Sequence, residues 1–310
     1  MEPSSGNLQR QDVLIVGTGA VACLFAARLS AGGVSVIMLG SWPAGLQALS
    51  QSGARVLEAN GLETAQPVQA LKSLSECQGV RYALVLVKSW QTEVAAKQLA
   101  RCLAPDGLAL TLQNGFGNYN VLVQALGSRR VAQGALTLGA TMIAPGIVRS
   151  TGGGVVTLGL HPHLQDMTNL LGRAGMVVET VSDFVSVQWG RQVINSAMHP
   201  VTAILNIPNG ELLQRPSARS LLQTAAREAA GVAVARGVHL PYPDPVIACE
   251  AIASQTATNI SPMLQDVRRG APTVIEYING EVVRVGEKTG VPTPVNRALM
   301  LLVKALKPGG

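Results

Sequence analysis

A glycine-rich turn near the start of the chain limits the possible folds more than any other feature of the sequence. The turn reads Gly17-Thr18-Gly19-Ala20-Val21-Ala22 and follows a short apolar run, Asp12 to Val16. A helical pattern then covers Ala20 to Ser30, and a second apolar run covers Val34 to Leu39. Strand, turn, helix and strand in this order predict a βαβ unit with two parallel strands.

The same alternation continues through the first half of the chain. Strand-like runs follow at Tyr82 to Val87, Leu108 to Gln113, Val131 to Met142 and Val155 to Leu158, and helical stretches at Gln91 to Leu103 and Asn118 to Leu126. Strands that alternate with helices are typical of a parallel sheet covered by helices on both faces. We therefore predict an α/β fold that begins with a Rossmann doubly wound parallel sheet.

The second half of the chain has a different character, because helical patterns replace strands. These patterns cover Val185 to Leu205, Ser217 to Arg236, Pro245 to Ser254 and Thr273 to Gly290. A chain of 310 residues also exceeds the usual size of one hydrophobic core. We expect two domains, a Rossmann domain over residues 1–180 and an all-helical domain over residues 181–310.

Composition and charge exclude several classes of partner. The formal charge is +6, but the basic residues are scattered and form no stripe, which argues against nucleic acid. No apolar run is long enough for a membrane span, and the first ten residues lack the pattern of a signal peptide. The four cysteines show no metal-ligand spacing, so we expect buried thiols, no metal and a cytoplasmic protein.

The context of the glycine turn assigns it a chemical role. After a strand and before a helix, G-x-G-x-x-G/A is the fingerprint of a dinucleotide-binding site. Gly17 permits the tight turn, Gly19 lets the backbone approach a pyrophosphate, and Ala22 keeps the helix close to the sheet. The helix N-terminus offers free N–H groups to the phosphates. We therefore predict that Gly17, Thr18, Gly19, Ala20, Val21 and Ala22 bind the cofactor.

The end of the second strand indicates which dinucleotide is bound. An acid there binds the ribose hydroxyls of NAD and repels the 2′-phosphate of NADP. The sequence reads Leu39-Gly40-Ser41-Trp42 and contains no acid, which favours NADP. No Arg stands there either, so Ser41 is a candidate phosphate partner and Trp42 a candidate adenine-stacking surface. The alternative is an exposed loop without cofactor contact.

Four later segments carry more specific motifs. They are LVLVKSW at Leu84 to Trp90, LQNGFGN at Leu112 to Asn118, HPVTAILNIPNGEL within Trp189 to Leu212, and IEYING at Ile275 to Gly280. Together these segments resemble the ketopantoate reductase family. The resemblance implies a reductase that delivers hydride from NADPH to the C2 carbonyl of a 2-oxo acid such as 2-dehydropantoate. It also implies that Lys88 and Asn114 lie at strand ends facing the ligand cleft. Otherwise Lys88 is a solvated charge and Asn114 a turn residue.

One helix of the second half carries three polar residues of interest. Arg191, Asn195 and His199 are spaced i, i+4 and i+8, which aligns them on one helical face. Periodicity alone leaves a hydrated stripe open as an alternative, and the resemblance makes the stripe a wall of the substrate site. The resemblance also implies that Asn209, in the IPNGEL turn, binds substrate, although turn geometry before Gly210 explains it equally well.

The chain departs from the pattern of the family at four site positions. The family's proton-donating lysine falls on Arg191, its second helical asparagine on His199, its substrate-binding serine on Pro262 and its glutamate on Val274. Glu276 is a neighbouring substrate-binding candidate, although a helix turns it about 200° away from Val274. A guanidinium does not release its proton readily, so the proton would come from Lys88, His199 or water.

Three functions are compatible with these observations. The first is an NADPH-dependent reductase of 2-dehydropantoate or a related 2-oxo acid, with Arg191 as electrophile and anion anchor. The second keeps the fold but recasts the site for a different substrate, and the third is a non-catalytic nucleotide-binding module. In each case the expected ligands are small molecules, the protein is a monomer or a homodimer, and neither nucleic acid nor membrane is a partner.

Overall fold

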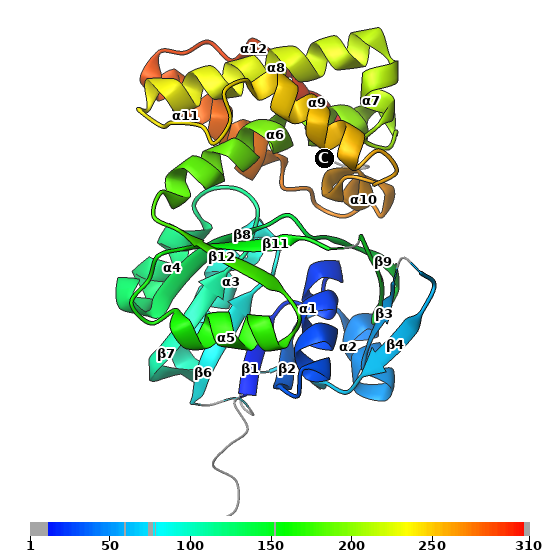
Figure 1. The fold of residues 1–310 in the computed structure, drawn as a ribbon, viewed down its shortest axis with the longest axis vertical. Helices are drawn as coiled ribbons and strands as arrows, with labels where there is room; N and C mark the ends of the chain where they lie inside the picture. The colour runs from blue at the N-terminus through cyan, green and yellow to red at the C-terminus, as the bar shows by residue number, and fades with distance from the viewer. Residues whose placement is uncertain (1–11, 59, 74–76, 78, 152, 307–310) are drawn as a thin grey trace, which may run out of the picture. The chain divides into compact units, whose positions relative to one another are not determined.

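The computed structural model describes residues 12–58, 60–73, 77, 79–151 and 153–306, and it forms two compact units (Figure 1). The first unit holds the described residues up to Gln113 and those from Asn118 to Ser182. The second holds Asn114–Gly117 and the described residues from Asp183 onward. The first is α/β and the second helical, so the predicted fold class is confirmed.

An eight-stranded sheet forms the centre of the first unit. Its order is β12 (Val177–Val181), β11 (Val155–Gly159), β8 (Val131–Leu136), β7 (Leu103–Thr111), β6 (Val80–Val85), β1 (Asp12–Val16), β2 (Ser35–Leu39) and β5 (Gln69–Leu71). All neighbouring strands are parallel except β8 and β11, which are antiparallel. The carboxyl ends of β1, β2, β5, β6 and β7 therefore meet at one edge of the sheet.

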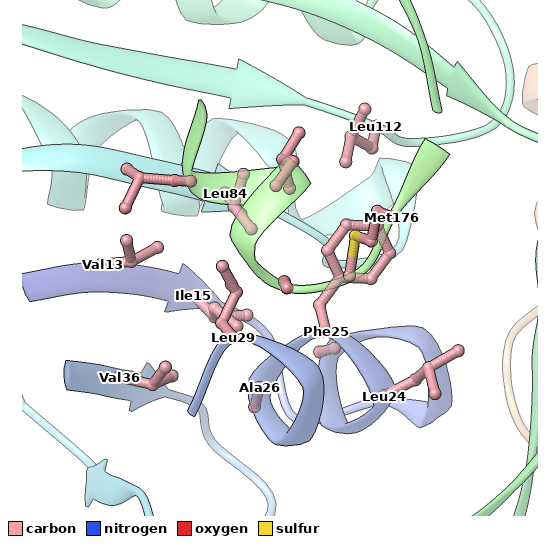
Figure 2. Packing of buried hydrophobic residues seen from close by; sticks show 14 of the residues in the cluster. Val13, Ile15, Leu24, Phe25, Ala26, Leu29, Val36, Leu84, Leu112 and Met176 are labelled. Atoms are coloured by element: carbon pink, nitrogen blue, oxygen red, sulfur yellow. The ribbon is translucent and has the colours of Figure 1, made fainter. Parts of the chain in front are cut away.

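The residues of the central strands alternate between two hydrophobic clusters, as the period of a strand requires. Val13 and Ile15 belong to the cluster that includes α1 (Ala20–Ala31) and α5 (Gln165–Arg173) (Figure 2). Leu14 and Val16 belong to the opposite cluster. That second cluster includes α3 (Thr92–Cys102) and α4 (Asn118–Leu126). Helices thus cover both faces of the sheet.

A second, four-stranded sheet also packs against α1. Its order is β4 (Glu63–Gln66), β3 (Ala54–Leu57), β10 (Ile147–Ser150) and β9 (Ala140–Ala144), and α2 (Pro43–Ser52) precedes β3. The prediction of one strand from Val131 to Met142 was wrong, because β8 ends at Leu136 and β9 pairs in the other sheet. The Gly139 backbone N–H donates to the Thr151 hydroxyl at 3.0 Å instead of to a carbonyl of β11, so the chain leaves the large sheet at this point.

Helices make up the second unit. They are α6 (Phe184–Leu205), α7 (Glu211–Gln214), α8 (Pro216–Ala235), α9 (Pro245–Gln255), α10 (Pro262–Arg268), the π-helical segment η4 (Glu276–Gly280), α11 (Glu281–Thr289) and α12 (Pro294–Ala305). The Asp183 carboxylate caps α6 by accepting from the Ser186 backbone N–H at 3.0 Å. The helix ends at Leu205, and the C-cap residue Asn206 is left-handed with a φ of 55°.

A proline inside α6 is compensated by a distant side chain. Pro200 has no backbone N–H, so the Ser196 carbonyl loses its helical donor. The Asn279 amide donates to that carbonyl at 2.9 Å and to the Asn296 side-chain oxygen at 3.0 Å. Asn279 is fully buried. The asparagine of the IEYING segment therefore stabilises the long helix and joins it to α12.

A carboxylate from α8 caps the first turn of α12 by accepting hydrogen bonds from it. Glu228 accepts from the Val295 and Asn296 backbone N–H groups, both at 2.9 Å, and from the Asn296 side chain at 2.8 Å. We expect Glu228→Ala to lower the free energy of unfolding by about 2 to 4 kcal/mol, because buried donors and a helix N-terminus lose a charged acceptor. Denaturant titration followed by circular dichroism measures the change.

The matched control for this variant is Glu287→Ala in the same unit. Glu287 pairs with Arg297 on the surface, and exposed ion pairs contribute less than about 1 kcal/mol. Equal losses in the two variants would contradict the structural role of Glu228.

The described part of the chain contains no helix that is both long and apolar enough to cross a membrane. Within the same residues, His, Cys, Asp and Glu side chains do not gather in groups of three that could hold a metal ion.

Candidate functional site

The glycine turn lies against the neighbouring strand β6. Gly17 has a φ of 134°, and its N–H donates to the Leu39 carbonyl at 2.8 Å. A Cβ at Gly17 would lie 3.0 Å from the Leu86 carbonyl carbon and oxygen. Only glycine adopts this conformation and fits this space without strain. The turn and the residues after β6 are therefore held together at the carboxyl edge of the sheet.

The start of α1 is open in the way a phosphate site requires. Gly19 is the N-cap residue, and the helix has neither a side-chain cap nor an acid in its first turn. A Cβ added at Gly19 would meet nothing within 4 Å. Unsatisfied N–H groups and the positive end of the helix dipole thus face open space, which is suited to an anion.

The first residue after β2, Gly40, has no room for a side chain. A Cβ at Gly40 would lie 2.5 Å from the Thr18 methyl carbon, and Thr18 is buried. Ser41 is exposed. The indole of Trp42 lies over Gly45, where a Cβ would be 2.3 Å from the ring, and Trp42 is 39% exposed. The structure thus places an exposed hydroxyl beside a supported aromatic surface.

Lys88 lies just beyond β6, close to the glycine turn. It is half-buried and two residues after Leu86, the residue that abuts Gly17. Its backbone N–H donates to the Gln91 side-chain oxygen at 3.3 Å. Lys88 and Gly17 therefore share one edge of the sheet, as the sequence predicts for residues at strand carboxyl ends.

A chain of hydrogen bonds that sequence reasoning missed holds the segments after β6 and β7. The Gln113 amide donates to the Val87 carbonyl and the Thr92 hydroxyl, both at 2.9 Å. Thr92 donates to the Asn118 side-chain oxygen at 2.8 Å, and the Asn118 amide donates to the Ser89 hydroxyl at 3.2 Å. These bonds fix the backbone on both sides of Lys88. In the sequence these bonds are marked only by scattered polar residues such as Gln113 and Asn118.

In the second unit, Arg191 meets Asn114. The guanidinium donates to the Asn114 side-chain oxygen at 3.4 Å. Burial lowers the pKa of Arg191 to about 10, so this side chain is still a cation at neutral pH. Two residues predicted for the site from distant segments are therefore in contact, and together they present a charge and an amide.

Asn195 and His199 continue the stripe on α6. Asn195 is half-buried, and in the described part of the chain its side chain makes no hydrogen bond. His199 is buried, and its carbonyl accepts from the Thr202 hydroxyl at 2.9 Å. The opposite side of the helix carries Trp189 and Val193 into the core of the unit. The predicted polar face thus exists, and it becomes more buried toward His199.

Aromatic packing holds the segment Asn114–Gly117 in the second unit. The rings of Phe116 and Trp189 lie 4.9 Å apart between centroids. Gln192, one residue after Arg191, donates to the Ile278 carbonyl at 2.7 Å. These contacts fix the position of Arg191 on α6 relative to Asn114 and to η4.

The structure places Asn209 in a loop contact. Its amide donates to the Thr256 hydroxyl at 2.9 Å, and its backbone N–H donates to the Asn259 carbonyl at 3.0 Å. The side-chain oxygen is buried and has no hydrogen-bond partner among the described residues. The observed contacts stabilise the turn and leave one buried acceptor available.

Glu276 and its neighbours lie in different surroundings. The Glu276 carboxylate is half-exposed and forms an ion pair with Lys304 of α12. Val274 is buried in an apolar cluster. Pro262 opens α10, and the preceding Ser261 uses its hydroxyl to cap that helix and to bond Thr202 at 2.7 Å. No carboxylate or free hydroxyl therefore stands at positions 262 and 274.

A parallel sheet with a glycine turn and an uncapped helix at its carboxyl edge, joined to a helical unit, defines the class of Rossmann-type oxidoreductases with a helical C-terminal domain. Comparison with known proteins agrees. Residues 13–163 match the family model "Ketopantoate reductase PanE/ApbA", and residues 183–307 match its C-terminal model. The chain belongs to the ketopantoate reductase PanE/ApbA family.

Relatives match over nearly the full length. The 2-dehydropantoate 2-reductase of Archaeoglobus fulgidus is 33% identical over 304 residues, which cover 96% of this chain and 99% of the relative. A PanE/ApbA family ketopantoate reductase from Ralstonia eutropha has a TM-score of 0.88 and 32% identity, covering 95% of this chain and 98% of that one. A D-mandelate dehydrogenase solved with NADH and anilino(oxo)acetate shares the fold, with a TM-score of 0.88, 24% identity and coverage of 95% and 97%.

Proposed function

We propose that this protein is an NADPH-dependent reductase of a small 2-oxo acid, with 2-dehydropantoate as the first substrate to test. The contact between Arg191 and Asn114 carries the substrate half of this proposal, because it joins an anion anchor to an amide. Membership in the family and the names of full-length relatives support the reaction type. The first unit would bind the nucleotide, and the helical unit would supply the groups for substrate.

The residues of the first unit fit a dinucleotide. Open space at Gly19 and the uncapped start of α1 leave room for a pyrophosphate, with Thr18, Ala20, Val21 and Ala22 forming the turn and the first helical residues. Ser41 and Trp42 would face the adenosine end, and Lys88 the nicotinamide end. When bound, the reduced nicotinamide supplies the hydride for the carbonyl carbon.

The side chains of the helical unit would bind and polarise the substrate. The guanidinium of Arg191 can hold a carboxylate or a developing oxyanion with two parallel hydrogen bonds. Asn195 has an amide available for the same ligand. Because the pKa of Arg191 is about 10, the guanidinium keeps its proton at neutral pH. The proton for the alkoxide would come from Lys88, from His199 or from water.

A second candidate function keeps the reaction but changes the substrate. Val274 is buried among apolar residues, and the Ser261 hydroxyl is engaged by Thr202 and the helix cap. A substrate with hydroxyl groups would find few partners there, at a cost of about 1 to 3 kcal/mol for each unpaired group. These observations favour a 2-oxo acid with an apolar side chain.

The test is a titration of the purified protein with NADPH and NADH, followed by oxidation assays with 2-dehydropantoate and with 2-oxo acids that carry apolar side chains. We expect binding of the reduced nucleotide and turnover of at least one 2-oxo acid. Faster turnover of the apolar acids would favour the second candidate. Binding without turnover of any 2-oxo acid would reject the proposed reaction.

A further inference from the structure

The edge strand β5 ends beside the end of β2. The two strands are parallel, with Leu39 opposite Leu71, and the Gly40 N–H donates to the Leu71 carbonyl at 3.2 Å. Lys72 directly follows Leu71, so its backbone lies next to Gly40 and Ser41 although the sequence separates them. The strand register therefore brings Lys72 close to the segment after β2, which contains no cation of its own.

The charges around this place favour an anion. Lys72 is exposed, and within the residues that the structure describes it forms no hydrogen bond or ion pair. Two other cations of the unit are engaged: Arg55 pairs with Glu63, and Arg28 donates to the Ser150 hydroxyl. The space at Gly40 is closed to an acid by Thr18. Position 40 is therefore closed to a repelling carboxylate, and an exposed lysine follows the neighbouring strand.

We propose that Lys72, the residue after β5, binds the 2′-phosphate of NADPH together with the Ser41 hydroxyl and sets the preference for NADPH over NADH. The inference rests on the proposed function, because it requires the nucleotide to lie along the carboxyl edge of the sheet. The adenine would then stack on Trp42, whose ring is supported by Gly45. A lysine is a suitable partner, because its ammonium attracts a phosphate as a point charge.

The test measures dissociation constants for NADPH and NADH by isothermal titration calorimetry, independently of any activity. We expect Lys72→Ala to raise the dissociation constant for NADPH about tenfold and to leave that for NADH unchanged. Lys72→Glu should raise the NADPH constant further, on the order of a hundredfold, because repulsion replaces attraction. Lys72→Arg should retain the preference. Because the Lys72 side chain is exposed, these variants should fold like the wild-type protein, and circular dichroism checks this.

The matched control is Lys97→Ala, which removes an exposed lysine from α3 in the same unit and should change neither constant. Equal weakening of NADPH and NADH by Lys72→Ala, or no weakening of either, would overturn the role of Lys72 while the proposed reductase function stands. If the wild-type protein binds neither nucleotide, the proposed function itself fails, and this inference fails with it.

Discussion

Replacing Arg191 by alanine should lower kcat/KM for the 2-oxo acid by about 10²- to 10³-fold, the loss that follows removal of one donor to a developing oxyanion. The guanidinium is the cation that contacts Asn114 on the helical unit, and alanine leaves neither a charge nor a donor there. Steady-state kinetics with saturating NADPH measures the loss, and the NADPH dissociation constant should not change.

Arg191→Lys is the control for charge. It keeps a cation but loses the planar fork, so we expect a smaller loss than with alanine. The pH dependence gives an independent check. Burial lowers the pKa of Arg191 to about 10, so the cation is present below that pH and is lost as the pH rises through it. KM for the acid should stay flat through the neutral range and rise above about pH 10. Unchanged kinetics in Arg191→Ala would remove this residue from the site.

The βαβ start of the fold was predictable because its signals are local. An apolar run, a glycine turn and a helical period follow one another without interruption between Asp12 and Leu39, and the structure has β1, α1 and β2 there. The stripe of Arg191 and Asn195 was predictable for the same reason, because one helical period places both on a single face of α6. Local periodicity is sufficient where neighbours in the sequence are also neighbours in space.

The second sheet was missed because its strands carry weak local signals. β4 reads ETAQ, which contains no apolar run. The edge strand β5 of the large sheet reads QAL and was missed for the same reason. β3 is stabilised by pairing with β10, a strand far away in the sequence. The prediction of one strand from Val131 to Met142 failed in the same way, because an apolar run does not show where the chain changes sheets.

The roles of Asn279 and Lys72 depend on packing between distant elements and on strand register, which no short stretch of the sequence shows. Asn279 compensates for Pro200 because the two elements pack together, and the sequence shows the proline without its partner. The segment from Gly40 to Trp42 contains no cation, whereas pairing of β5 with β2 brings Lys72 to the end of β2. Polar groups of this kind are recognised only when the tertiary contacts are known.

Replacing Gly17 by alanine should impair both folding and nucleotide binding. The residue has a φ of 134°, and its Cβ would lie 3.0 Å from the Leu86 carbonyl. Backbone strain of this kind costs about 1 to 3 kcal/mol, and displacement of the segment after β6 would move Lys88. We expect thermal unfolding at lower temperature and a loss of NADPH affinity of at least about tenfold.

Gly19→Ala separates the two effects, because its backbone suits any residue. Gly19 has φ and ψ of −76° and 179°, and an added Cβ meets no protein atom within 4 Å. The fold should therefore be unaffected, while the methyl group occupies space that a pyrophosphate needs. Gly172→Ala, in the open on α5, should raise stability by about 0.5 to 1 kcal/mol without changing NADPH affinity. Full NADPH binding by Gly19→Ala would show that the phosphates do not approach the backbone at this turn.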